Sequence, residues 1–179
     1  CFLLFLNSFN MFDGINLQVV LYSLFICLVL IFFTGFKILF ASLIISLLFF
    51  IILNFKSKSF LGDGGTYLLS YIFSYLFIKL YNQTNVIYAD QIVLVMLLPG
   101  LELMRLFVIR LASKKNPFSA DRNHLHHLLL RKNNFLRATL ITQSLIILPF
   151  VFSILIGFTI GFVFLVLILY SIIVFKYNQ

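Results

Sequence analysis

Long apolar runs separated by short polar segments follow one another along almost the whole chain. Runs of roughly 16 to 20 apolar residues, enough to cross a bilayer as helices, lie at 17–35, 38–53, 66–81, 91–110, 138–156 and 160–175. Stretches such as VVLYSLFICLVLIFF do not alternate between apolar and polar positions, as the strands of a membrane barrel do. Because hydrocarbon cannot satisfy backbone amides, the pattern predicts an all-α polytopic transmembrane helix bundle with about six complete spans.

Three local features modify these spans. Pro99 and Gly100 lie in the middle of the fourth run and predict a kink or a break there. The runs at 38–53 and 66–81 are short, which predicts tilt or local thinning of the bilayer. The chain is apolar from Cys1 onward with no basic segment before it, so we expect the end of a helix truncated at its N-terminus and not a signal peptide.

The composition agrees with a membrane protein and locates one of its faces. The chain is 63% hydrophobic and 10% charged, with a net charge of +8, whereas about a quarter of a soluble domain is charged. Alternating crossings place the loops near 7–16, 54–65 and 111–137 on one side, and 34–37 and 80–90 on the other. Most basic residues lie near the first side, which the positive-inside rule makes cytoplasmic.

The charge therefore has an ordinary explanation in topology and in attraction to anionic membrane lipids. Nucleic acid is not expected as a partner. Cys1 and Cys27 lack a CxxC or CxxH spacing, so we expect them to fill apolar space and not to bind metal.

The five acidic residues are distributed unevenly over this topology. Asp13, Asp63 and Asp121 lie in the three cytoplasmic loops. Glu102 lies within the fourth span, and Asp90 lies on the opposite face. Acids within or beside spans are costly and often functional, so the loops that hold them are candidate sites.

The first loop reads NSFNMFDGIN, in which Asn7, Asn10 and Asp13 repeat every third position and share one face of a helix end. Amides and a carboxylate suit a metal or a nucleotide, and Gly14 lets the chain turn. An ordinary Asn- and Asp-rich turn between spans explains the same composition equally well.

The second loop, NFKSKSFLGDGGTYLL, places Asp63 among glycines at the start of a helix. Asp is a favoured N-cap residue, but three glycines exceed what a cap requires. Glycines let a ligand approach the backbone, and one or two carboxylates with substrate phosphates commonly hold Mg²⁺. We therefore favour binding of a hard cation over simple capping.

The third loop, KKNPFSADRNHLHHLLLRKN, combines Asp121 with three histidines and several basic residues. His124 and His127 are three apart and are predicted to share a helix face, with His126 directed elsewhere. Zinc binding lacks the HExxH pattern. Histidines that donate to phosphate oxygens fit the basic surroundings better, and a merely solvated basic loop is the alternative.

Taken together, these segments resemble the polyprenyl-phosphate N-acetylhexosamine-1-phosphate transferases over nearly the whole chain. NSFNMFDGIN is similar to the family's NxxNxxDG segment, FLGDGGT to its F-x-GD-x-G-S/T segment, LLPGLELMRLFVIR to its P-x-x-D-x₇-R segment and PFSADRNHLHH to its DRxHxHH loop. The HxHH form resembles the branch that starts O-antigen, teichoic-acid and capsule synthesis.

The resemblance implies an activity and its partners. A UDP-N-acetylhexosamine would give its sugar-1-phosphate to undecaprenyl phosphate, with release of UMP. The implied location is the bacterial inner (plasma) membrane, crossed several times, with the site loops in the cytoplasm. Residues 1–179 would form a single membrane domain, the C-terminal part of a larger transferase domain.

The resemblance also implies roles for individual residues. Asp13 and Asp63 would be catalytic, and Asp63 would coordinate Mg²⁺ together with Asn10, Mn²⁺ being the alternative ion. The implied substrate-binding residues are Asn7, Asn10, Asn16, Asp121, Arg122, His124, His126 and His127. Phosphoryl transfer depends on positioning and charge neutralisation, which such a set of residues offers.

The chain departs from the family's pattern at several positions. DGxD stands here as DGIN, with Asn16 in the last place, and Glu102 stands where an Asp is usual. The family's DDxxD motif has no counterpart in the chain, which holds no DD pair, and we expect it upstream of Cys1. A fragment without this motif is expected to be inactive alone.

Other hypotheses belong to different classes. A non-catalytic transporter would use the kinked fourth span and Glu102 as its translocation site. A degenerate transferase fragment would carry the motifs without the activity. A membrane metal hydrolase is disfavoured because HExxH is absent.

Overall fold

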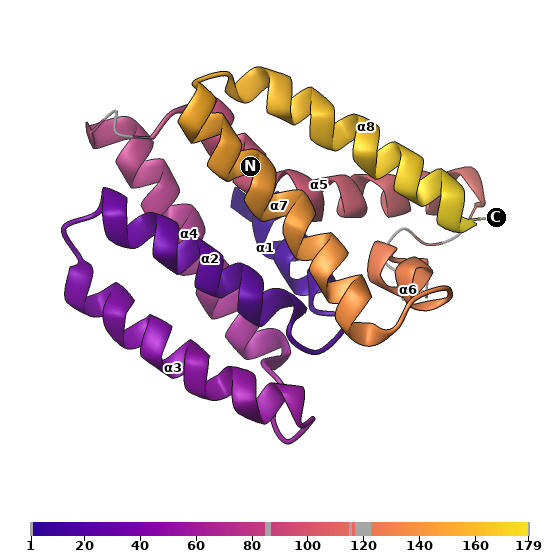
Figure 1. Cartoon of the computed structure of the whole chain (residues 1–179), viewed down its shortest axis with the longest axis horizontal. Helices are drawn as coiled ribbons and strands as arrows, with labels where there is room; N and C mark the ends of the chain where they lie inside the picture. Colours follow the sequence, from indigo (N-terminus) through magenta and orange to yellow (C-terminus); the bar gives the residue numbers. More distant parts are fainter. Residues whose placement is uncertain (1, 85–86, 115, 117–122, 179) are drawn as a thin grey trace. The chain divides into compact units, whose positions relative to one another are not determined.

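The computed structural model describes residues 2–84, 87–114, 116 and 123–178 (Figure 1). Within these residues every regular element is an α-helix, which confirms the all-α prediction. The helices are α1 (Phe2–Phe12), α2 (Gln18–Phe33), α3 (Lys37–Phe55), α4 (Gly62–Thr84), α5 (Ala89–Ala112), α6 (Leu125–Leu130), α7 (Phe135–Ile156) and α8 (Thr159–Asn178).

Six of these helices coincide with the six apolar runs. Four of the described helices, α3, α5, α7 and α8, are long and apolar enough to cross a membrane. Few side chains of α3 and α8 are buried within the protein, which is expected where a helix faces lipid. The chain is thus a multi-pass membrane protein built as a helical bundle.

The structure bears on two expectations about individual spans. The helix is not broken at Pro99, because α5 runs without interruption from Ala89 to Ala112, and the kink there stays a prediction. A proline removes a single backbone donor, and neighbouring groups in a membrane helix can compensate for it. The helices α3 and α4 have 19 and 23 residues because polar residues at their ends continue them beyond the apolar runs. Tilt or local thinning of the bilayer at these two runs stays a prediction.

The contacts divide the chain into two compact units, Cys1–Ile92 and Val93–Gln179. The expectation of one membrane domain over 1–179 stays a prediction. In the first unit α2 packs against α3, and α1 packs against α4 (Figure 1). The ring of Phe9 lies 5.4 Å from that of Tyr22 and 6.0 Å from that of Phe73, so aromatic packing joins α1, α2 and α4.

The second unit holds most of α5 together with α6, α7 and α8. Gly157 ends α7 in the left-handed conformation, with φ of 76°, and the chain turns into α8, which packs against α7. The short helix α6 packs against both. Its leucines Leu125, Leu128 and Leu129 are completely buried, so the apolar side of α6 is fixed in the unit.

Candidate functional site

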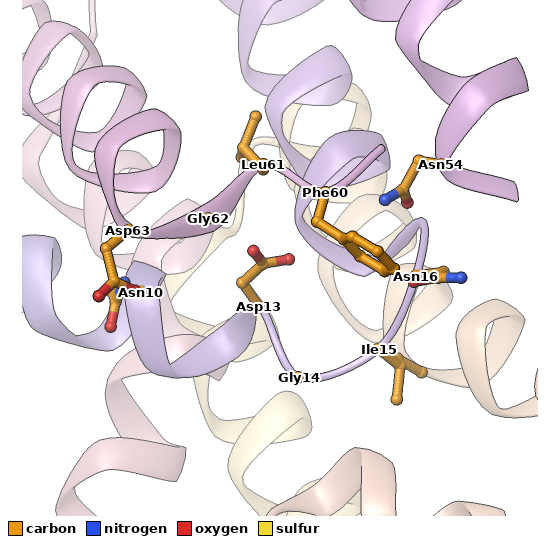
Figure 2. A pocket seen from close by; sticks show the side chains of 10 residues that line it. All are labelled: Asn10, Asp13, Gly14, Ile15, Asn16, Asn54, Phe60, Leu61, Gly62 and Asp63. Carbon is orange, nitrogen blue, oxygen red and sulfur yellow. The ribbon is translucent and has the colours of Figure 1, made fainter. Parts of the chain in front are cut away.

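A cavity of about 320 Å³ lies in the first unit, where the end of α1 and the start of α4 meet the loops beside them (Figure 2). Acid and amide side chains from the first two candidate loops line it. The lining residues are Asn10, Asp13, Gly14, Ile15, Asn16, Asn54, Phe60, Leu61, Gly62 and Asp63. The fold therefore brings together two segments that are about fifty residues apart in the sequence.

Asn10 joins the two segments directly. Its amide nitrogen donates to Asp63 Oδ1 and to Thr66 Oγ1, both at 2.9 Å. Thr66 is completely buried, and its hydroxyl is also bonded to the backbone of the first turn of α4. Because Asn10 donates to one oxygen of Asp63, it fixes the orientation of the carboxylate.

A second connection holds the loop after Asp13 in place. The buried Asn54 accepts a hydrogen bond from the backbone N–H of Leu17 at 2.6 Å and donates to the carbonyl of Ser59 at 2.9 Å. Asn16 donates to the hydroxyl of Ser57 at 2.8 Å. These bonds support the left-handed backbone of Leu17, with φ of 67°, and so fix the cavity wall.

Asp13 lies in the cavity within reach of the charge of Asp63. Burial, and then the negative charge of Asp63, raise the pKa of Asp13 to about 6. A cation near both groups would relieve this repulsion. Two carboxylates and an amide suit a hard cation that takes its remaining ligands from phosphates and water.

A metal centre held only by protein side chains would need several ligating residues close together. In the part of the chain that the structure describes, no three His, Cys, Asp or Glu side chains gather in a way that could hold a metal ion. The acid and amide side chains that line the cavity are a partial ligand set, of the kind that holds a hard cation together with substrate phosphates.

Four of the predicted residues meet at the cavity: Asn10, Asp13, Asn16 and Asp63. Asn7 is not among its lining residues; it is exposed and donates to the carbonyl of Leu3 at 3.0 Å. Sequence reasoning missed Asn54 and Thr66. Both gave a signal, since Asn54 is a polar residue at the end of an apolar run and Thr66 follows the GDGG segment.

The three histidines of the third loop form a cluster in the second unit. The ring centroids of His124 and His126 are 5.2 Å apart and stacked, and those of His126 and His127 are 4.3 Å apart. The expectation that His126 is directed elsewhere is wrong, because His124 precedes α6 with an extended backbone (ψ of 150°) and does not follow helical spacing. Asp121 and Arg122 lie outside the described residues.

His126 lies in the interior of this cluster. It is 2% exposed, and its Nε2 has no hydrogen-bond partner within the described residues. Burial, and then the neighbouring His127 and His124, lower the pKa of His126 to about 3. The imidazole is therefore neutral at physiological pH, with one N–H donor available to it.

Two comparisons with known proteins find a match. Residues 1–81, which contain the whole cavity, match the family model for glycosyl transferase family 4. An undecaprenyl-phosphate alpha-N-acetylglucosaminyl 1-phosphate transferase from Thermotoga maritima is 34% identical over 139 residues, which are 77% of this chain and 44% of that protein. No solved structure matches the chain.

The chain spans less than half of the length of this relative. The family match and the relative nevertheless agree, and the chain belongs to glycosyl transferase family 4.

Proposed function

We propose that the intact protein transfers an N-acetylhexosamine 1-phosphate from a UDP-sugar to undecaprenyl phosphate and releases UMP. The observation that carries the proposal is the meeting of Asp13 and Asp63 in one cavity, inside the segment that matches the family. The name of the similar protein supports the donor and the acceptor classes.

The reaction exchanges one phosphoanhydride bond for another. An oxygen of the lipid phosphate attacks the β-phosphorus of the UDP-sugar, and the oxygen that bridges the two phosphates leaves with UMP. Both reactants are anions, so the site must hold them together against their mutual repulsion. Positioning and charge neutralisation are the main contributions that a protein makes to such a transfer.

Mg²⁺ is the ion that we propose for the cavity, with Mn²⁺ as the alternative. Asp63 would hold it, with Asn10 orienting the carboxylate and supplying its amide oxygen as a further ligand. Bound there, the ion would neutralise phosphate charge. The charge of Asp63 reaches Asp13, and Asn16 lines the same wall, which supports substrate contacts for both Asp13 and Asn16.

The histidine cluster would bind phosphate oxygens of the donor. His124, His126 and His127 lie side by side, and we propose that Arg122 and Asp121 complete the loop. A neutral imidazole such as that of His126 donates one N–H, and a protonated one adds a positive charge. Asn7, being exposed on α1 away from the cavity lining, would contact substrate only at its edge.

We further propose that the protein lies in a bacterial inner membrane with its site loops in the cytoplasm, where UDP-sugars are found. The excess of basic residues on that side supports this orientation. The product would start a cell-envelope polysaccharide such as O-antigen, teichoic acid or capsule.

The test is a direct assay of the full-length gene product in detergent micelles. With undecaprenyl phosphate, Mg²⁺ and each of several UDP-amino sugars in turn, one donor is expected to yield UMP and lipid-linked sugar in equal amounts. Chelation of the metal should stop both. Failure to form either product with every donor would contradict the proposal, whereas UMP without a lipid product would indicate hydrolysis.

A further inference from the structure

A buried acid–base cluster lies in the second unit beside the histidine loop. The carboxylate of Glu102, which is 4% exposed, accepts bonds from Arg105 Nε at 3.1 Å and Nη2 at 3.0 Å, both within α5. The hydroxyl of Tyr170, on α8, also donates to it. A transporter would need Glu102 as an exchangeable site, but here the carboxylate is satisfied by protein groups.

The same two charged residues hold the backbone on both sides of His124. Arg105 Nη2 donates to the carbonyl of Asn123 at 2.6 Å. Glu102 Oε2 accepts from the backbone N–H of Leu125 at 2.8 Å. The residue before His124 and the residue after it are therefore both bonded to one ion pair, while the His124 Nδ1 lies 4.0 Å from Glu102 Oε2.

This support is independent of the apolar packing of α6. The helix has only 6 residues, too few to be stable by itself. Its leucines fix one side of it against α7 and α8, but they do not determine the backbone at His124, which precedes the helix in an extended conformation. In the described part of the loop, Glu102 and Arg105 supply hydrogen bonds to the peptide groups that flank His124.

We propose that Glu102, with Arg105 and Tyr170, is a positioning residue of the transferase: it holds the backbone around His124, so that the histidine cluster presents its nitrogens to the phosphates in one geometry. The proposal rests on the proposed function for its effect on catalysis. Its structural part, the fixing of residues 123–130 by the buried carboxylate, is testable without activity.

The first arm of the test measures kcat/KM for UMP release in full-length variants. Glu102→Gln keeps the size of the side chain but turns one acceptor oxygen into a donor facing other donors, and we expect a loss of about 100-fold, the order caused by small misplacements of a catalytic group. Glu102→Asp retains the carboxylate and should recover at least about tenfold of that loss. Tyr170→Phe, which removes one donor, should reduce kcat/KM by about three- to tenfold.

Tyr177→Phe is the matched control. Tyr177 is also on α8, and its hydroxyl accepts from Asn133 at 3.0 Å, so this change removes a comparable hydrogen bond away from His124. We expect kcat/KM to remain within about twofold of wild type. If Glu102→Gln also stayed within twofold of an active wild type, the proposal would be overturned.

The second arm measures amide hydrogen exchange over residues 123–130. Glu102→Gln and Tyr170→Phe should speed exchange in this segment and leave exchange in α7 unchanged. Tyr177→Phe should leave exchange in both segments unchanged. Lost activity with unchanged exchange would overturn the positioning role. If Glu102→Gln does not fold, the comparison of Tyr170→Phe with Tyr177→Phe decides. Equal kcat/KM and equal exchange in these two variants would overturn the proposal.

The two measurements distinguish failure of the proposed function from failure of the positioning role of Glu102. If wild type transferred no sugar phosphate from any UDP-sugar, the proposed function would fail, and the exchange arm alone would decide whether Glu102 fixes the histidine loop.

Discussion

At the residue scale, the surroundings of Asp13 in the cavity oppose ionisation of its carboxyl group. Its carboxylate is partly buried near a second carboxylate, and these two effects raise its pKa. The folded protein therefore binds a proton on Asp13 more tightly than the unfolded chain does. Between pH 3.8, the ordinary value, and about pH 6, stability falls as pH rises, because folding then opposes ionisation.

Asp13→Asn should therefore stabilise the metal-free protein at pH 7.5. After allowance for solvent screening we expect about 1 kcal/mol, or about 3 °C in Tm, with loss of transfer activity. The gain should shrink as the pH is lowered below about 6, because wild-type Asp13 then becomes protonated. Thermal unfolding at several pH values measures this gain in stability, with Asp90→Asn as a control outside the cavity. A gain in Tm that does not depend on pH would contradict this account.

At the element scale, the start of α4 determines where Asp63 lies. Gly62, the first residue of this helix, has a φ of +64°, a conformation that residues with a Cβ rarely adopt. Gly64, two positions later, has open space around the position of a Cβ and an ordinary φ. The backbone conformation therefore favours glycine at position 62, whereas neither the backbone nor the available space requires glycine at position 64.

Substitution of these glycines should have opposite effects on stability. Gly62→Ala should cost about 1 kcal/mol through backbone strain, or about 3 °C in Tm. Gly64→Ala should leave the Tm unchanged or raise it, since alanine favours a helix. Thermal unfolding of the two variants checks this, and an equal loss in both would show that the left-handed turn at Gly62 is not what matters.

The helices could be predicted because each one corresponds to a run of apolar residues, which is a local property of the sequence. Much of the site could not be predicted in this way, because it depends on contacts between separate segments. The side chain of Asn54 has two backbone partners. The N–H of Leu17 reaches it only when α2 and α3 pack together, and the carbonyl of Ser59 reaches it only because the chain turns after α3. Likewise, the orientation of His126 depends on the extended backbone of His124, which the assumption of helical spacing did not include.

At the scale of the whole molecule, the predicted crossings assign a side of the membrane to each loop. Lys58 lies in the loop predicted to be cytoplasmic, and Gly35 lies in a loop predicted to face the other side; both are exposed. Neither residue lines the cavity. They form a matched pair for testing the orientation.

Lys58→Cys and Gly35→Cys should react with a membrane-impermeant maleimide from opposite sides, in a background where Cys1 and Cys27 are replaced by alanine. In intact cells we expect labelling at position 35 and, in inside-out vesicles, at position 58. Labelling of both from the same side would contradict the predicted crossings, and the reverse pattern would contradict the positive-inside assignment.

The central claim is that the cavity around Asp63 carries out sugar-phosphate transfer. The most direct measurement compares UMP release by full-length Asp63→Asn and Asp90→Asn, each with the donor that wild type uses. Asp63 lines the cavity and Asp90 does not, so we expect Asp63→Asn to lose at least about 1,000-fold in kcat and Asp90→Asn to remain within about twofold of wild type. Unchanged turnover in a folded Asp63→Asn protein would contradict the account.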